Sequence, residues 1–381
     1  MRLKLPALFT RRPVGATAAA TAATAAMSAA PARRRWPWQR GSATGRLAIC
    51  STADRFIYAQ ADAHGRLQRC GQLARGSDTP AAFAKQVHAL GLSSLQVGAV
   101  LPLAQAQLLQ IEAPAVKADE MKAAARWRIK DQIEGRLDDH TIDVMFVGSD
   151  KPGLHRQLFV AVARNTAVRE LSELGLAAGL NVNVIDLTEI TQRNLHAEQA
   201  RRDGLADRAT AALVQHGDQC VLTVCVAGEL YYARRLDWDA QALPCASAHP
   251  SPGALAAAAL AAAARPALEL EAVDFIDYGA EPEDTPGGHD EAPRQVVELQ
   301  RSFDVWERSW PDLPLARLWV QLGDNSPQHA AMLARQLGQS VAVLDVAAIF
   351  PELAACAPDL VLRDALLPLL GLLLRDDTRR F

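Results

Sequence analysis

Short apolar runs and helical apolar spacings alternate along residues 45–200. The runs are typical of strands, whereas apolar residues that recur every three to four positions are typical of helices. Thr79 and Pro80 predict a helix start, because Thr caps free N–H groups and Pro suits the first turn. Gly91 and Gly179 suit helix ends. The predicted strands cover 47–49, 56–61, 65–73, 95–101, 107–111, 142–147, 157–163 and 182–185, and the predicted helices cover 79–91, 119–134, 165–178 and 188–199.

The second half of the chain repeats this order. Each half opens with antiparallel strands and continues with strand–helix alternation, which predicts a mixed α/β protein of two related lobes. We expect lobes at 45–200 and 207–381, divided by the charged segment 201–206, with the final helix packing back on the first lobe. The predicted strands are 211–214, 220–226, 229–236, 268–276, 317–322 and 341–344, the predicted helices are 255–264, 296–309, 329–337 and 360–375, and the predicted surface loops are 244–252 and 280–293.

This order of elements is typical of the actin/hexokinase/Hsp70 superfamily, a duplicated ribonuclease H-like fold. At 381 residues and 50% hydrophobic composition, the chain is long enough for two such lobes.

Charge is divided unevenly along the chain. Residues 1–46 carry nine basic side chains and no acidic one, and the remainder carries 31 basic against 43 acidic residues, a net charge of −12. An acidic body argues against a nucleic-acid partner, which needs clustered Lys and Arg. Residues 1–44 are rich in Ala, Thr and Arg and are predicted to form a disordered basic arm. Its Arg and Trp residues at 33–38 suit peripheral contact with an anionic membrane, and a solvated tail is the alternative.

Cysteine spacing and hydropathy exclude several classes of protein. The six cysteines form no CxxC pair and no His-bearing cluster, so we expect small packing residues in a reducing cytosol and no zinc site. The longest apolar segment, 365–374, is about half of the 18–20 residues that a membrane-spanning helix needs. The acid-free start has the composition of an organellar transit peptide, but the heavy use of Ala and Arg favours a bacterial source.

Five blocks in order between residues 45 and 381 resemble the PilM-like family of type IV pilus assembly proteins, in particular its MshI branch of MSHA pilus biogenesis. They are 123–133 with the strand 143–146, then 177–186 with 193–195, 298–304, 318–345 and 366–375. The resemblance implies an actin-like ATPase fold in a cytoplasmic protein associated with the inner membrane. It also implies two partners, a PilN-like bitopic inner-membrane protein and the pilus assembly ATPase.

In the ATP-binding members of this superfamily, two hairpin loops with an Asp each and a Gly-rich loop hold the nucleotide and its Mg²⁺. The first hairpin loop corresponds to residues 50–53, which contain neither Gly nor Asp, although Asp54 follows. Glycine matters in such loops because a side chain blocks the approach of the backbone to phosphate.

The other two loops are also degenerate. The second hairpin loop, 215–218, keeps Gly217 but has Gln215 in place of Asp, and the adenosine loop, 322–325, has the single glycine Gly323. If nucleotide binds at all, Gly217, Asp218 and Gly323 are the residues expected to contact it. We expect no catalytic residue, no metal ligand and no resident cofactor, with ATP and Mg²⁺ disfavoured.

The sequence therefore predicts a non-enzymatic scaffold that binds the cytoplasmic tail of a PilN-like protein, with a nucleotide cleft that no longer works as an ATPase. An ATP-binding switch or kinase of the same superfamily is the first alternative. A component of type II secretion with a related cytoplasmic domain is the second.

Overall fold

The computed structural model describes residues 45–92, 96–148, 157–238 and 293–375. Several predicted segments lie outside these ranges: the arm 1–44, the loop 244–252, the helix 255–264 and the strand 268–276. The predicted loop 280–293 lies outside them except for its last residue. No helix in the described ranges is long and apolar enough to cross a membrane.

The chain divides into two compact units, and the division differs from the predicted lobes. Unit 1 comprises Met1–Leu195 and Val346–Phe381, and unit 2 comprises His196–Asp345. The final helix belongs to unit 1, in agreement with the expectation that it packs back on the first lobe, and the segment from Val346 that precedes this helix belongs to unit 1 as well.

Unit 1 contains a five-stranded sheet in the order β3-β2-β1-β4-β8. Its strands are β1 (Arg46–Ser51), β2 (Arg55–Ala61), β3 (Leu67–Ala74), β4 (Gln96–Leu101) and β8 (Val182–Leu187). The first three strands form an antiparallel meander, and β4 and β8 continue it in parallel. The antiparallel pairs follow directly along the chain, whereas the parallel ones need crossovers through helices.

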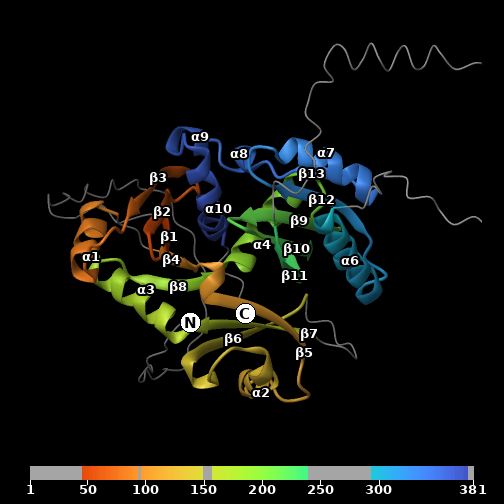
Figure 1. Cartoon of the computed structure of the whole chain (residues 1–381), viewed down its shortest axis with the longest axis horizontal. Helices are drawn as coiled ribbons and strands as arrows, with labels where there is room; N and C mark the ends of the chain where they lie inside the picture. The colour runs from red at the N-terminus through yellow and green to blue at the C-terminus, as the bar shows by residue number, and fades with distance from the viewer. Residues whose placement is uncertain (1–44, 93–95, 149–156, 239–292, 376–381) are drawn as a thin grey trace, which may run out of the picture. The chain divides into compact units, whose positions relative to one another are not determined.

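Helices cover both faces of this sheet. On one face α3 (Asn165–Ala177) packs on β4 and β8, and α1 (Pro80–Ala89) packs on α3. On the other face α10 (Leu360–Leu373) contacts β1, β2 and β4. Gly98 of β4 faces α10, since a Cβ there would lie 2.8 Å from Leu372 Cδ2. Figure 1 shows these helices around the sheet. Two short helices, α8 (Val346–Ile349) and α9 (Leu353–Cys356), precede α10.

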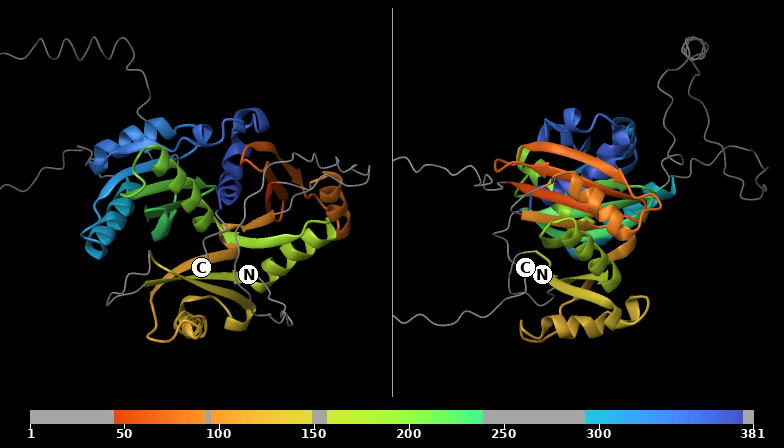
Figure 2. Two further views of the ribbon diagram at one scale, coloured as in Figure 1. Left: turned by 180° about the vertical axis from the view of Figure 1, so that it is seen from behind. Right: turned by 90° about the vertical axis from the view of Figure 1, so that its left-hand side faces the viewer.

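A second, three-stranded sheet of unit 1 has the order β5-β7-β6 and is antiparallel throughout. Its strands are β5 (Ala106–Glu112), β6 (His140–Phe146) and β7 (Gln157–Arg164), and α2 (Met121–Arg128) packs on one face, as both views of Figure 2 show. Met121, Ala125, Ile129 and Ile133 lie in this core, as their spacing predicts. The helix nevertheless ends at Arg128 rather than near 134, and a 3₁₀ turn (Lys130–Gln132) continues the segment.

Unit 2 has a five-stranded sheet in the order β11-β10-β9-β12-β13. Its core lies between this sheet and the helices α6 and α7, around Trp306, Phe303 and Leu333. The elements are β9 (Ala209–His216), β10 (Gln219–Val226), β11 (Glu229–Asp237), α6 (Arg294–Ser309), β12 (Leu315–Gln321), α7 (Ser326–Leu337) and β13 (Val341–Val343). The chain passes from unit 1 to unit 2 within α4 (Thr188–Arg202). His196 of this helix contacts Thr210 and Thr223, on the face of the unit 2 sheet that points away from α6 and α7.

Candidate functional site

A groove of about 380 Å³ runs through unit 1 between its two sheets. Its floor is the face of the three-stranded sheet that points away from α2, with Met145 of β6, Phe159 and Ala161 of β7 among the lining residues. Its walls are β8 and the Val168 side of α3. Alternation along the strands explains this arrangement, because Ile142 and Val144 of β6 pack against α2 while their neighbours point to the other face.

Two strand edges border the groove. In the described ranges β8 pairs only with β4, and β6 pairs only with β7. Both strands contribute several consecutive residues to the lining, residues 141–145 from β6 and Val182–Leu187 from β8. A strand edge presents backbone N–H and C=O groups that pair readily with another extended chain. The groove thus combines an apolar floor with two edges suited to backbone pairing.

Charged groups lie at both ends of the groove. At the rim, Lys122 Nζ lies 3.4 Å from Asp143 Oδ1, and both side chains are more than half exposed. At the inner end, Asp186 forms an ion pair with Arg375, whose side chains are 7% and 18% exposed. Asp186 Oδ1 also accepts a hydrogen bond from the Leu187 N–H at 3.0 Å. The inner pair is therefore a fixed structural feature, whereas the rim pair is solvated and weak.

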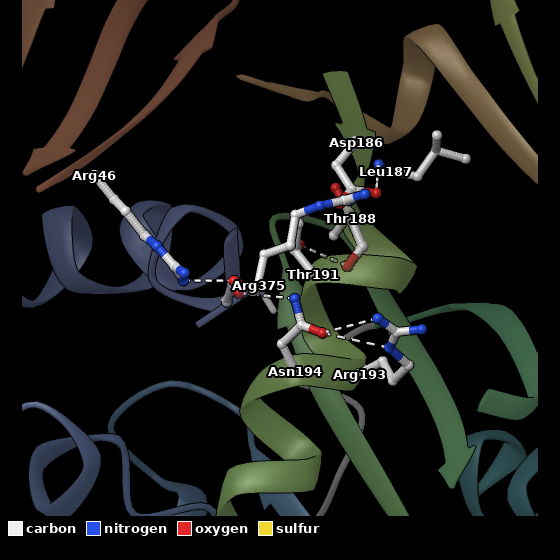
Figure 3. A network of polar contacts seen from close by, with 9 residues as sticks. Arg46, Asp186, Leu187, Thr188, Thr191, Arg193, Asn194 and Arg375 are labelled. Carbon is white, nitrogen blue, oxygen red and sulfur yellow. Dashed lines mark hydrogen bonds and ion pairs between the residues drawn. The ribbon is translucent and has the colours of Figure 1, made fainter. Parts of the chain in front are cut away.

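The inner ion pair belongs to a network that fixes the end of α10, as Figure 3 shows. Arg46 of β1 donates hydrogen bonds to the carbonyl oxygens of Leu373, at 2.9 Å, and Arg375. Asn194 Nδ2 of α4 donates to the Gly371 carbonyl oxygen at 2.9 Å. Carbonyl groups at a helix C-terminus lack partners within the helix, so these donors satisfy them and hold Arg375 beside the groove.

The first predicted nucleotide loop is a tight turn closed on itself. The Thr52 N–H donates to the Arg55 carbonyl oxygen at 2.9 Å, and the Arg55 N–H donates to Thr52 Oγ1 at 3.2 Å. The Thr52 hydroxyl also donates to the Asp54 carboxylate, and this bond lowers the pKa of the carboxyl group. The Thr52 hydroxyl and the Asp54 carboxylate thus bond to each other and hold the turn in place.

The other two predicted loops lie near each other in unit 2, at the carboxyl ends of adjacent strands. β9 and β12 are parallel, with Val214 opposite Gln321, and each loop follows directly. Gly217 and Gly323 both have a φ of +69°, and nothing lies within 4 Å of a Cβ built on either. Turn conformation alone therefore explains both glycines.

Internal hydrogen bonds occupy these loops as well. Ser326 Oγ accepts from the Leu322 N–H at 2.8 Å and donates to the Gly323 carbonyl oxygen at 2.5 Å. Gln215 Nε2 donates to the Gly217 carbonyl oxygen at 2.9 Å. Asp218 is exposed, and its carbonyl oxygen accepts from the Trp238 N–H at 2.9 Å. Within the described ranges, no group of three His, Cys, Asp or Glu side chains is placed to hold a metal ion. The residues present fit ATP and Mg²⁺ poorly.

Two units, each with a five-stranded sheet and flanking helices, define a mixed α/β protein of actin-like fold. The chain is similar in structure to the solved "PilM-PilN type IV pilus biogenesis complex", at a TM-score of 0.58 and 17% identity over 86% of this chain and 97% of that one. Two weaker likenesses are to the cytoplasmic domain of EpsL, an inner-membrane component of the type II secretion system of Vibrio cholerae, and to a protein with actin-like ATPase fold and unknown function from Bacteroides thetaiotaomicron. Their TM-scores are 0.38 and 0.44, at 14% and 10% identity, over 54% and 79% of this chain and 76% and 91% of theirs.

No protein-family model matches the chain, and neither does any curated protein. The likeness to the PilM–PilN structure shows the fold, and the predicted actin-like α/β class is confirmed.

The groove was not predicted from the sequence. Three separate segments build it, and its apolar residues, such as Ala161, Val184 and Ile185, have the same appearance in sequence as core residues. The available signal was Asp186, a carboxylate directly after the predicted apolar strand 182–185 and within the observed β8.

Proposed function

We propose that this chain is a non-enzymatic cytoplasmic scaffold of type IV pilus biogenesis, of the PilM-like class and its MshI branch. In this proposal, its unit 1 groove binds the cytoplasmic tail of a PilN-like inner-membrane protein. The groove between two strand edges is the observation that carries the proposal. The fold shared with the PilM–PilN structure supports the choice of partner.

The lining of the groove suits an extended peptide. The peptide backbone would pair with the edge of β6 or β8, and alternate apolar side chains would lie on Met145, Phe159 and Ala161. Backbone pairing supplies affinity without regard to sequence, so the apolar floor supplies the selectivity. The proposal thus predicts a tail segment with apolar residues at every second position.

A binding titration tests this proposal. We expect a fluorescent peptide of the PilN-like tail from the same organism to bind the full chain. An Ala161→Trp variant fills the groove and should weaken binding by about tenfold or more, roughly 1.4 kcal/mol. Ala177→Trp, on the exposed side of α3, is the matched control and should bind as the unaltered chain does. No binding by a folded chain, or equal binding by both variants, would contradict the proposal.

The scaffold would work at the inner face of the membrane, where it links the PilN-like protein to the pilus assembly ATPase. Residues 1–44 would add peripheral electrostatic attachment, because they carry eight basic side chains and no acidic one. Vesicles with anionic lipid should therefore bind the full chain in a salt-sensitive way and lose that binding when 1–44 are deleted.

We also propose that the chain does not hydrolyse ATP. The support is chemical, since the first loop has no glycine and the other two close on their own hydrogen bonds. A titration with a fluorescent ATP analogue and Mg²⁺ should stay flat to millimolar nucleotide. Saturable binding that is lost in Asp218→Ala or Gly323→Val would instead support the switch or kinase alternative.

A further inference from the structure

Two thiols from distant parts of the sequence meet in unit 1. Cys70 lies on β3, the edge strand of the five-stranded sheet, and Cys356 is the last residue of α9. The two elements contact each other, and a hydrogen bond joins the two cysteine side chains. Both residues are half-buried, so small molecules reach them from solvent.

The other described cysteines differ from this pair. Cys50, Cys220 and Cys225 are 8%, 0% and 2% exposed, and they pack among apolar neighbours. Burial raises the pKa of Cys50 to about 12 and also raises that of Cys220, and it keeps dissolved oxidants away from both thiols. Chemistry with an external oxidant is therefore confined, among the described cysteines, to the pair on β3 and α9.

We propose that Cys70 and Cys356 form a reversible dithiol–disulfide site whose reaction partner is a low-molecular-weight disulfide such as oxidised glutathione. In the first step the thiolate of one cysteine attacks an oxidant sulfur, forms a mixed disulfide and releases one glutathione thiolate. In the second step the other cysteine loses its proton and attacks the protein sulfur of the mixed disulfide. The protein disulfide forms and the second glutathione leaves. Two protein thiols are oxidised, one glutathione disulfide is reduced, and two protons pass to the glutathione thiolates.

Contact between the two thiols favours the second step. Because a hydrogen bond joins Cys70 and Cys356, whichever of them forms the mixed disulfide already has the other within reach. The second step is therefore intramolecular and fast relative to a second collision. Exchange with reduced glutathione reverses both steps.

The bridge would fasten a structurally important segment. Cys356 belongs to the part of unit 1 that returns after unit 2, and the α10 helix on the sheet follows it directly. A disulfide between residues 70 and 356 closes a loop that contains all of unit 2, and long closed loops restrict the unfolded chain most. The oxidised protein should therefore unfold at a temperature several degrees higher than the reduced one.

Peptide mapping of the full-length chain tests the site. The chain is equilibrated at rising ratios of oxidised to reduced glutathione, alkylated and cleaved with trypsin. Cleavage beside Arg69 and Arg75, and beside Arg335 and Arg363, isolates each cysteine in its own peptide. We expect a linked pair of these peptides whose amount follows the glutathione ratio and which a reductant abolishes.

Single substitutions serve as controls. Cys70→Ser and Cys356→Ser should each lose the linked peptide and the rise in unfolding temperature, whereas Cys245→Ser should keep both. Separate alkylation of Cys70 and Cys356 at every ratio, or glutathione adducts without the linked pair, would overturn the proposal. Mapping of the unaltered chain gives this answer even if a variant fails to fold.

Discussion

At the scale of single residues, His196 in unit 2 is a buried histidine held by two hydroxyl groups. Its Nε2 lies 2.9 Å from Thr210 Oγ1 and its Nδ1 lies 3.2 Å from Thr223 Oγ1, and the ring meets Trp319 edge-on. The side chain is fully buried, and burial lowers its pKa from 6.5 to about 3. Because no charged group is among these neighbours, the ring stays neutral in the folded protein and bridges two hydroxyl groups.

This environment predicts a loss of stability in acid. Below pH 6.5 the unfolded chain protonates His196 while the folded chain does not until about pH 3, so the unfolded state binds more protons in this range. As the pH is lowered through this range, the free energy of unfolding therefore decreases, by about 1.4 kcal/mol per pH unit from this group alone. Above pH 6.5 the contribution is complete and constant.

Urea unfolding at pH 7 and pH 5 measures the effect. The unaltered chain should lose about 2 kcal/mol more between these values than His196→Gln, which keeps polar contacts but does not titrate. Burial also lowers the pKa of His329, but that residue is present in both proteins and cancels in the comparison. Equal losses in the two proteins would contradict this assignment.

At the scale of elements, the packing of α10 on α4 depends on a glycine. A Cβ built on Gly371 would lie 2.1 Å from the Thr191 carbonyl oxygen and 2.7 Å from the Thr191 carbonyl carbon. Both atoms belong to the backbone of α4, which cannot rotate aside as a side chain does. The same contact region contains the hydrogen bond from Asn194 to the Gly371 carbonyl oxygen.

Gly371→Ala should therefore destabilise the protein, although alanine favours a helix by about 1 kcal/mol over glycine. We expect a net loss of about 1–3 kcal/mol in the free energy of unfolding, from forced separation of the two helices. Gly175→Ala in α3 is a matched control, since its Cβ would lie 2.8 Å from the Val182 Cγ2 methyl, which shifts more easily, and 3.2 Å from the nearest backbone atom, the Leu180 carbonyl oxygen. Chemical denaturation of both variants should show the larger loss for position 371.

Local signals predicted most elements but not every boundary. Thr79 caps α1, accepting from the Ala82 N–H at 3.3 Å, and Gly91 and Gly179 have φ values of +63° and +74° at helix ends. The helix predicted from 329 begins at Ser326, with Pro in its first turn. Predicted and observed boundaries agree where a cap or a glycine acts within one turn of chain.

Buried polar positions were beyond such local signals. α4 contains Thr191, Gln192, Arg193 and His196, all at most 4% exposed, yet its sequence shows no apolar stripe. Their burial depends on partners far along the chain, such as Thr223 for His196. The same holds for the groove, whose edges are separated by about forty residues of sequence.

At the scale of the whole molecule, unit 1 is discontinuous and unit 2 is continuous. All five strands of the unit 2 sheet and the helices of its core lie between His196 and Asp345. The unit 1 sheet, in contrast, needs α10 on its second face, where Leu366, Leu369 and Leu370 are completely buried. Without that helix, a face of apolar side chains would be exposed to water, at a cost of about 25 cal/mol per Å².

This difference predicts how fragments behave. Residues 196–345 alone should unfold cooperatively on heating, because every strand pairing and the main core of unit 2 are retained. Residues 45–195 alone should not, but should regain a cooperative transition when residues 346–381 are joined to them through a Gly/Ser linker. The joined fragment also keeps both partners of the Arg375–Asp186 ion pair and the whole groove lining. Asp186→Ala in that fragment should lower its unfolding midpoint, since the half-buried Arg375 would lose its ion pair with Asp186. Circular dichroism monitors these transitions. A cooperative transition of 45–195 by itself would show that residues 346–381 are dispensable and would contradict the division of the chain.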